Sequence, residues 1–331
     1  SDSLLMTIKG KYTKGNDVVY PSPASVLPMA QQPEVFRRIG LMHNLLLEAY
    51  PQPLGLEAKW FGKLSNGTFA DDVNFSHGIL VWMYFYSCTF LSYTCVQNKP
   101  NEVAPLADVY DHFNVFVNQI GALQNDFKLD TMTINSRKVY MLNPVVGSWK
   151  GYDLYGSPGE GFRAILLKRK GESPITPVTR KEYLEYCFRY FNIFFENQAK
   201  PMREMADRQL RDELINKVNG MKEDVIKRYQ AEWKTSSDAN LLDSPAEIYS
   251  PFTITEGTPI FASGPDGGKM LVTENPAYIK KDLPKYAPQF MVLYWKWTSD
   301  FPMYGGEQGV YFKKTLEAHF PIEKLQAMID K

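Results

Sequence analysis

Residues 179–200 read TRKEYLEYCFRYFNIFFENQAK, and residues 201–233 read PMREMADRQLRDELINKVNGMKEDVIKRYQAEW. This stretch is the longest helical signal in the chain. Thr179 and Glu182 match a capping box, in which the hydroxyl accepts from the third helical N–H and the glutamate accepts from the Thr179 N–H. Because Pro201 lacks an N–H and clashes with the preceding turn, we expect it to kink or restart the helix.

The two halves of this helical arm differ in their apolar pattern. Residues 183–195 are apolar around most of the helix, which is typical of a helix buried on several sides. The second half carries apolar side chains at intervals of three or four, with charged residues between them: Leu210, Leu214, Val218, Met221, Val225, Tyr229 and Trp233. We expect this stripe to lie across another part of the protein or to pair with another helix.

The segments around the arm are predicted to be mostly strands. A β-prone run at 163–168 precedes it, and residues 132–142 read as a hairpin with its turn at Asn135-Ser136. A further strand is expected at 289–297, and helices are expected at 33–50, after Pro33, and at 321–330. Residues 66–67, Asn-Gly, are typical of a turn.

Residues 73–98 form the longest stretch without Asp, Glu, Lys or Arg. Its centre approaches the length of a membrane span, but only Lys99 supplies a basic flank, and Ser, Thr and Tyr interrupt it. We therefore expect no transmembrane span, and predict one long buried strand or a hairpin turning near 90–92. Cys88 and Cys95 could pair across such a hairpin, whereas on one helix they would lie about 10 Å apart, too far for a disulfide.

These elements predict an α+β fold: a mostly antiparallel sheet packed against a long, Pro-kinked helical arm, with a smaller C-terminal β section. The expected sections are 1–161, an N-terminal α+β section; 162–235, a strand plus the arm; and 236–331, a β section with a terminal helix. A polar linker at 235–250 separates the last two sections, and one continuous domain is the alternative organisation.

Charge and composition exclude several classes of protein. Formal net charge is zero and 22% of residues are charged, so the chain is not globally disordered. The section 162–235 carries 16 basic and 11 acidic residues, a weaker excess than nucleic-acid-binding domains usually show, and we expect no nucleic-acid partner. The 14% aromatic content and a first residue other than Met lead us to expect a processed, extracytoplasmic (periplasmic or secreted) protein.

No specific catalytic or cofactor motif is present. The sequence has no His-Glu-x-x-His, Gly-x-Ser-x-Gly, phosphate-binding lysine loop or Cys-x-x-Cys, and we expect no catalytic residues, no cofactor and no dedicated metal site. The best metal-like cluster is weak: Asp108 and His112 would share a face only if residues 108–112 were helical, and no further ligand is marked.

Aromatic and basic residues provide the candidate binding site. Trp149 and Tyr152 lie next to a glycine-rich loop, where they could stack on a ligand, whereas Trp295 and Trp297 share one strand face and are predicted to be core residues. Arg169 and Arg180 are among the basic residues on both sides of 171–179. These residues could attract an anion near the N-terminus of the helix that begins at Thr179.

The first functional hypothesis is therefore a non-catalytic binding protein whose aromatic cleft takes a small molecule, a glycan or a protein. A second is a hydrolase with carboxylates from distant parts of the chain. A third is an interaction or assembly module that uses the amphipathic arm. The sequence alone does not choose between them.

Overall fold

The computed structural model describes residues 5–19, 29–69, 79–96, 99, 102–124, 132–156, 161–255, 257–263, 268–296 and 307–331. They form two compact units, each built from separate segments. Unit 1 comprises 1–125, 143–175 and 274–331, and unit 2 comprises 126–142 and 176–273. The sections expected from the sequence were each continuous, whereas here the C-terminal third of the chain is divided between the units. The predicted α+β class with mostly antiparallel sheets is confirmed.

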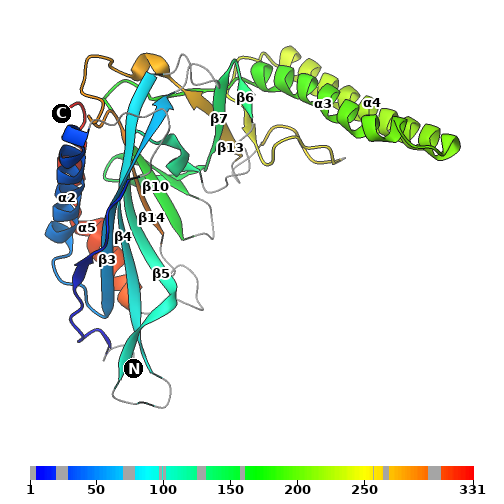
Figure 1. Ribbon diagram of the computed structural model, residues 1–331. Coiled ribbons are helices and arrows are strands. Elements are labelled where there is room, and N and C mark those ends of the chain that lie inside the picture. Colours follow the sequence, from blue (N-terminus) through cyan, green and yellow to red (C-terminus); the bar gives the residue numbers. More distant parts are fainter. Residues whose placement is uncertain are drawn as a thin grey trace. The chain divides into compact units, whose positions relative to one another are not determined.

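Unit 1 is built on a nine-stranded sheet with the order β1-β3-β4-β5-β14-β10-β9-β8, and β2 lies beside β3 (Figure 1). Among the described strands of this sheet, β1 and β2 alone pair in parallel with a neighbour, in both cases β3. The strands are β1 Tyr12–Lys14, β2 Val18–Val19, β3 Leu56–Phe69, β4 Ile79–Cys95, β5 Val103–Val117, β8 Val145–Trp149, β9 Tyr152–Gly156, β10 Phe162–Leu167 and β14 Met291–Lys296.

The neutral run forms β4, one strand of 17 residues paired on both sides. The hairpin alternative near 90–92 is wrong, since only a bulge between Leu91 and Tyr93 interrupts the register with β5. The turn expected at 66–67 is also wrong, because β3 continues through both residues, opposite Trp82 and Val81. Long-range pairing has overridden the local turn preference there.

Cys88 and Cys95 are both free thiols. They lie seven residues apart on one strand, about 23 Å at the usual rise per residue, so neither can reach the other. Among the described residues, no helix combines the length and apolar composition that a membrane span requires.

Helices cover one face of the nine-stranded sheet (Figure 1): α2 Gln32–Ala49, α5 Glu307–His319 and α6 Ile322–Gln326. Alternate β4 side chains enter this core, where Tyr84, Tyr86 and Cys88 are fully buried. Phe312 and Leu316 of α5 pack there too. Three short 3-10 helices complete the unit: η1 Met29–Gln31, η2 Ile120–Leu123 and η3 Pro276–Tyr278.

Asn118, directly after β5, is a fully buried polar residue with φ of 57°. Its Nδ2 donates to the carbonyls of Trp82 at 3.1 Å and Ala287 at 3.3 Å. Its Oδ1 accepts from the backbone N–H groups of Gln289 at 2.9 Å and Phe290 at 3.4 Å. One side chain thus joins the ends of β4 and β5 to the segment that leads into β14.

Unit 2 contains a five-stranded sheet with the order β11-β13-β7-β6, and β12 lies beside β13. The strands are β6 Thr133–Ile134, β7 Arg137–Leu142, β11 Ile175–Pro177, β12 Glu247–Ile248 and β13 Lys269–Glu274. The hairpin predicted at 132–142 is confirmed as β6 and β7. Asn135 and Ser136 have φ of 51° and 61°, as a two-residue turn with both central residues left-handed requires.

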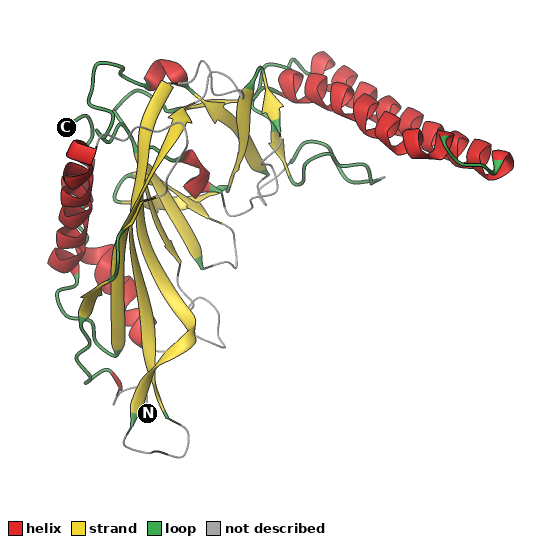
Figure 2. Ribbon diagram, viewed as in Figure 1, coloured by secondary structure: helices red, strands yellow, loops and turns green. Residues whose placement is uncertain are grey.

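The helical arm is a pair of helices, α3 Arg180–Arg203 and α4 Arg208–Asp238 (Figure 2). Pro201 lies in the last turn of α3, and Asp207 caps the next helix by accepting from the Leu210 N–H at 3.0 Å. The proline therefore precedes a chain reversal and a restarted helix. The two helices pack against each other: the rings of Phe188 and Trp233 have centroids 6.2 Å apart, and those of Phe191 and Tyr229 have centroids 4.9 Å apart.

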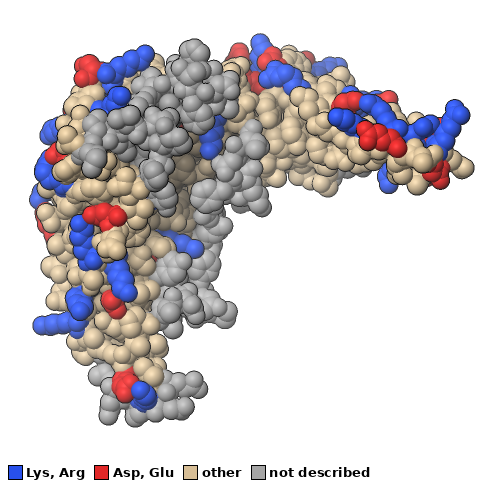
Figure 3. Space-filling view, in the orientation of Figure 1, with Lys and Arg blue, Asp and Glu red and all other residues tan. Residues whose placement is uncertain are grey.

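The apolar stripe of α4 is used mostly within the arm. Val218, Val225 and Tyr229 are buried in the unit 2 core together with α3, whereas Leu210 and Met221 remain 43% and 46% exposed. The pairing alternative for the stripe is thus confirmed. Figure 3 shows basic and acidic side chains intermixed along the outside of the arm in that view, with no continuous field of one sign.

Candidate functional site

Two of the four predicted binding residues meet in unit 1. Tyr152 and Arg169 line a hollow of about 390 Å³ together with Tyr155, Lys168 and Lys170. The basic residues follow β10, and the tyrosines come from β9. The sequence predicted Tyr152 beside the glycine-rich loop and Arg169 near the start of the arm, and it did not predict that the two would line one hollow.

Arg169 is already engaged by neighbouring residues of unit 1. Its guanidinium contacts Glu172 at 2.9 Å and Asp330 at 2.8 Å, and lies 3.6 Å from the ring centre of Tyr278. Lys168 donates to the Glu172 carbonyl at 2.7 Å. The ion pair with Asp330 attaches the C-terminal end of the chain to the end of β10. The positive charges of Arg169 and Lys168 are therefore already used in contacts within unit 1.

The other two predicted residues lie elsewhere. Trp149 packs edge-on against Trp295 with ring centroids 5.0 Å apart, and its Nε1 donates to the Glu317 carbonyl at 2.9 Å. Trp295 is 1% exposed, as predicted for a core residue, and Trp297 lies outside the described residues. Arg180 belongs to unit 2, where its guanidinium lies 4.6 Å from the ring centre of Phe261.

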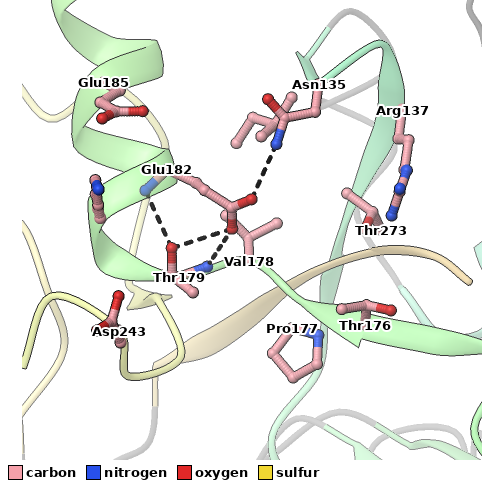
Figure 4. A pocket seen from close by; sticks show the side chains of 12 residues that line it. Asn135, Arg137, Thr176, Pro177, Val178, Thr179, Glu182, Glu185, Asp243 and Thr273 are labelled. Carbon is pink, nitrogen blue, oxygen red and sulfur yellow. Dashed lines mark hydrogen bonds between the residues drawn. The ribbon is translucent and has the colours of Figure 1, made fainter.

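A hollow of about 530 Å³ lies beside the start of α3 in unit 2 (Figure 4). Glu182 occupies its middle: Oε1 accepts from Asn135 Nδ2 at 2.9 Å, and Oε2 accepts from the Thr179 N–H at 2.9 Å and hydroxyl at 3.1 Å. The Glu182 N–H donates back to Thr179 Oγ1 at 3.1 Å. The predicted capping box is confirmed, and this carboxylate serves to start α3.

Replacing Thr179 by alanine is expected to lower the free energy of unfolding by about 1 kcal/mol, because the helix loses its N-terminal acceptor. Glu182→Gln should cost less, since glutamine can still accept from the Thr179 N–H. Urea unfolding followed by circular dichroism would measure both. Thr235→Ala, an exposed change near the end of α4, is the control. Equal stability of T179A and T235A would contradict a contribution from the cap.

A third site is the face of the unit 1 sheet opposite α2 and α5. Here five neighbouring strands, β3, β4, β5, β14 and β10, place side chains in three rows across the sheet. In strand order the rows are Lys63, Phe85, Phe116, Val292, Leu166; then Phe61, Ser87, Asn114, Tyr294, Ala164; then Lys59, Thr89, His112, Lys296, Phe162. We call these fifteen residues the aromatic face.

Ring contacts cross the aromatic face from strand to strand. Centroid distances are 6.1 Å for Phe61 and Phe85, 5.1 Å for Phe85 and Phe116, and 6.1 Å for Phe116 and Tyr294. Phe162 continues the series at 4.9 Å from Tyr294. The residues of β10 are buried, whereas the rings of β3, β4 and β5 stay half-exposed. The face is thus covered at one side and accessible at the other.

Polar side chains occupy the middle of the aromatic face. Ser87 and Asn114 form a cross-strand pair and are 6% and 8% exposed. Asn114 Oδ1 is fully buried and has no hydrogen-bond partner among the described residues. A buried acceptor without a donor lowers the stability of the folded protein by about 1–3 kcal/mol.

His112 lies in the next row, with Nδ1 3.5 Å from the Thr89 hydroxyl. Burial, together with the positive charge of Lys296, lowers the pKa of His112 from 6.5 to about 4. The imidazole is therefore neutral at pH 7, and a neutral imidazole offers one donor and one acceptor. The centre of the face is polar but carries no charge.

The weak metal prediction required Asp108 and His112 to lie on one helix, and this requirement is not met. Both residues lie on β5, and four residues along a strand span about 13 Å, so the helical chelating spacing does not exist. Within the described residues, no group of three or more His, Cys, Asp or Glu side chains is arranged to hold a metal ion.

The aromatic face was not predicted from the sequence. Both faces of β4 carry aromatic and small polar residues, so alternation does not distinguish the core face from the other one. The face also requires β14, which lies more than 170 residues after β5 in the chain and pairs between β5 and β10. No local signal specifies that insertion.

No family model, curated protein or solved structure matches this chain.

Proposed function

We propose that this protein is a non-catalytic binding protein and that its aromatic face takes a polyhydroxylated ligand, a glycan. The observation that carries the proposal is the buried Asn114 Oδ1, which has no hydrogen-bond partner among the described residues and lies between Ser87 and Tyr294 on one face. A ligand hydroxyl that donates to this oxygen would remove the cost of leaving it unpaired, and it reaches the oxygen only when neighbouring side chains move aside, because the atom is closed to solvent here.

The surroundings of Asn114 suit such a ligand. Ligand sites are mostly apolar, with a few placed polar groups that fix orientation. Half-exposed rings such as Phe61 and Phe85 can pack against the C–H surface of a sugar ring. Ser87, Thr89 and neutral His112 add hydroxyl and imidazole groups that can exchange hydrogen bonds with hydroxyls.

The alternatives have less support at this face. None of the fifteen residues is Asp or Glu, so the face lacks the paired carboxylates that the hydrolase alternative needs. The arm alternative would need its apolar stripe accessible, and three of the seven stripe residues, Val218, Val225 and Tyr229, are buried in the core that α4 shares with α3. The extracytoplasmic location remains a prediction from aromatic content.

Asn114→Leu separates ligand binding from folding. Leucine has a similar size and removes an unpaired buried acceptor, so the variant should be as stable as the parent protein, or more so. Ligand affinity should fall about tenfold or more, since the hydrogen bond is lost and the leucine is bulkier at its end. Asn192→Leu, the same change at an exposed position of α3, is the matched control.

The measurement is a thermal-shift screen of the parent protein against neutral and acidic oligosaccharides, followed by calorimetric titration of any stabilising compound. A ligand at a hundredfold excess over its dissociation constant adds about 2.7 kcal/mol of stability. If no oligosaccharide shifts the melting temperature, or if N114L binds as tightly as the parent, the proposed function is wrong.

A further inference from the structure

We infer that α4 of one molecule pairs with α4 of a second copy of this chain, in antiparallel orientation. The inference goes beyond the proposed function and does not depend on it. It rests on the side of α4 that α3 leaves uncovered, where Leu210 and Met221 are 43% and 46% exposed. Met221 and the exposed Asp224 also line a hollow of about 640 Å³ on this side.

The uncovered side of α4 consists of three rows in which residues recur every seven positions, or about two helical turns. The middle row is Leu210, Lys217, Asp224 and Ala231; one flanking row is Glu213, Gly220 and Lys227; the other is Leu214, Met221 and Arg228. We call these ten residues the arm face. Eight of them are exposed, and Leu214 and Arg228 are half-buried.

Gly220 lies at the centre of the arm face, in the interior of a helix of 31 residues. Glycine there is less favourable than alanine, and a Cβ at this position would meet no atom of the described chain within 4 Å. Contacts within the described chain therefore do not require a glycine, whereas a second helix crossing here would use the hole that it leaves. A two-fold axis between Gly220 and Met221 places the exposed Met221 of each molecule over the Gly220 of the other.

The same axis brings opposite charges together. Lys217 of each molecule lies opposite Asp224 of the other, and both side chains are exposed, with no ion pair inside the described part of the arm. Glu213 lies opposite Arg228 of the second copy. The guanidinium of Arg228 donates to backbone carbonyls, which leave its positive charge unneutralised. Symmetry doubles each pair, so the arm face is complementary to a reversed copy of itself.

Apolar groups fill the remaining positions of this register. Leu210 lies opposite Ala231 of the second copy. Leu214 lies opposite Lys227, whose aliphatic stem lines the hollow next to Met221. The half-exposed and exposed leucines of one molecule therefore meet apolar surface on the other.

Other arrangements of two α4 helices bring like charges together. In a parallel pair, Lys217 and Asp224 would each lie beside their own copies. Sliding the antiparallel pair by seven residues sets Lys217 opposite Lys217 in one direction, and Asp224 opposite Asp224 in the other. Charges that flank a helix pair select its orientation in this way, and here they select one antiparallel register.

Analytical ultracentrifugation of the full chain measures the self-association, and an exchange of charges tests the register. The variants are K217E, D224K, the double variant K217E/D224K, and G220Q. K200E reverses the charge of an exposed lysine of α3 and is the matched control. A concentration series covers dissociation constants of about 1–100 µM, and thermal melts at the lowest concentration report the stability of each variant.

We expect the parent to dimerise in this range, and K217E and D224K each to raise the dissociation constant about tenfold or more, because each puts like charges together at two symmetric places. K217E/D224K should return it to within about threefold of the parent, and K200E should match the parent. An effect inside one chain would show no such recovery, since residues 217 and 224 lie about 10 Å apart along α4.

G220Q should change two measurements in different directions. Glutamine is a better helix former than glycine, so the melting temperature should be no lower than that of the parent. Its side chain fills the hole that receives Met221 of the second copy, so the dimer should weaken about tenfold or more.

Three results would overturn the inference. The first is a parent protein that stays monomeric at the highest concentration. The second is a dimer that K217E, D224K and G220Q all leave unchanged, because the second copy would then bind elsewhere. The third is a double variant that associates no more tightly than K217E or D224K alone, because residues 217 and 224 would then not face each other across the axis.

Discussion

Asn118→Ala should lower the free energy of unfolding of unit 1 by about 3–5 kcal/mol, the largest effect expected here of any single polar substitution. The alanine leaves the carbonyls of Trp82 and Ala287 and the N–H of Gln289 without the partner they have now, at a fully buried position. It must also hold φ of 57°, a left-handed conformation that asparagine tolerates better than alanine does.

Two further variants divide this effect into its causes. Asn118→Gly removes the backbone strain but not the loss of hydrogen bonds, so it should recover only about 1 kcal/mol of the total. Asn135→Ala is the matched control, because Asn135 also has positive φ, 51°, but lies exposed at a hairpin turn. Its expected cost is about 1 kcal/mol.

Urea unfolding followed by tryptophan fluorescence is the measurement, since unit 1 contains five of the six tryptophans. The expected order of destabilisation is N118A, then N118G, then N135A. A midpoint for N118A within the error of the N135A midpoint would show that the hydrogen bonds around Asn118 do not hold β4, β5 and β14 together.

The second large effect is a loss of stability in mild acid. His43 lies in the core between α2 and the sheet, 6% exposed, with its ring stacked on Trp60 at a centroid distance of 4.1 Å and Nδ1 3.0 Å from the Tyr86 hydroxyl. Burial lowers the pKa of His43 from 6.5 to about 4. The imidazole is therefore neutral in the folded state over most of the acid range.

The sign of the pH dependence follows from this lowered pKa. Between about pH 6.5 and pH 4 the unfolded chain binds a proton at His43 that the folded protein does not, so acid favours unfolding. From pH 7.5 to pH 5 the free energy of unfolding should fall by about 2 kcal/mol for this residue. His112, with a pKa of about 4, adds a similar loss over the same range.

His43→Phe tests this assignment. Phenylalanine keeps a ring against Trp60 but leaves the Tyr86 hydroxyl without its partner, so H43F should be less stable by about 1–2 kcal/mol at pH 7.5. At pH 5 the variant and the parent should be about equally stable, because only the parent has a histidine at position 43 that is protonated in the unfolded chain and neutral in the folded one. His319→Gln, at an exposed position, is the control.

Urea unfolding at both pH values measures the four free energies. A parallel loss in H43F and the parent between pH 7.5 and pH 5 would show that another group causes the acid sensitivity. Combining His43→Phe with His112→Phe should remove most of the pH dependence in this window.

What the sequence alone determined about this protein was local. The capping box at Thr179, the turn at Asn135-Ser136 and the helix after Pro33 depend on hydrogen bonds and dihedral preferences within a few residues, and all three are present. Apolar spacing along 210–233 likewise predicted a packing helix, because the helical repeat puts those side chains on one face.

Tertiary structure decided how these pieces combine. The pairing of β14 between β5 and β10, the reversal of the arm after Arg203 and the division into two units all depend on contacts between residues far apart in the chain. Trp149 was a reasonable candidate for stacking on a ligand until residues 295 and 317 supplied its partners. The aromatic face has the same origin. Strand register brings its fifteen residues together from five strands, and each strand supplies only three of them.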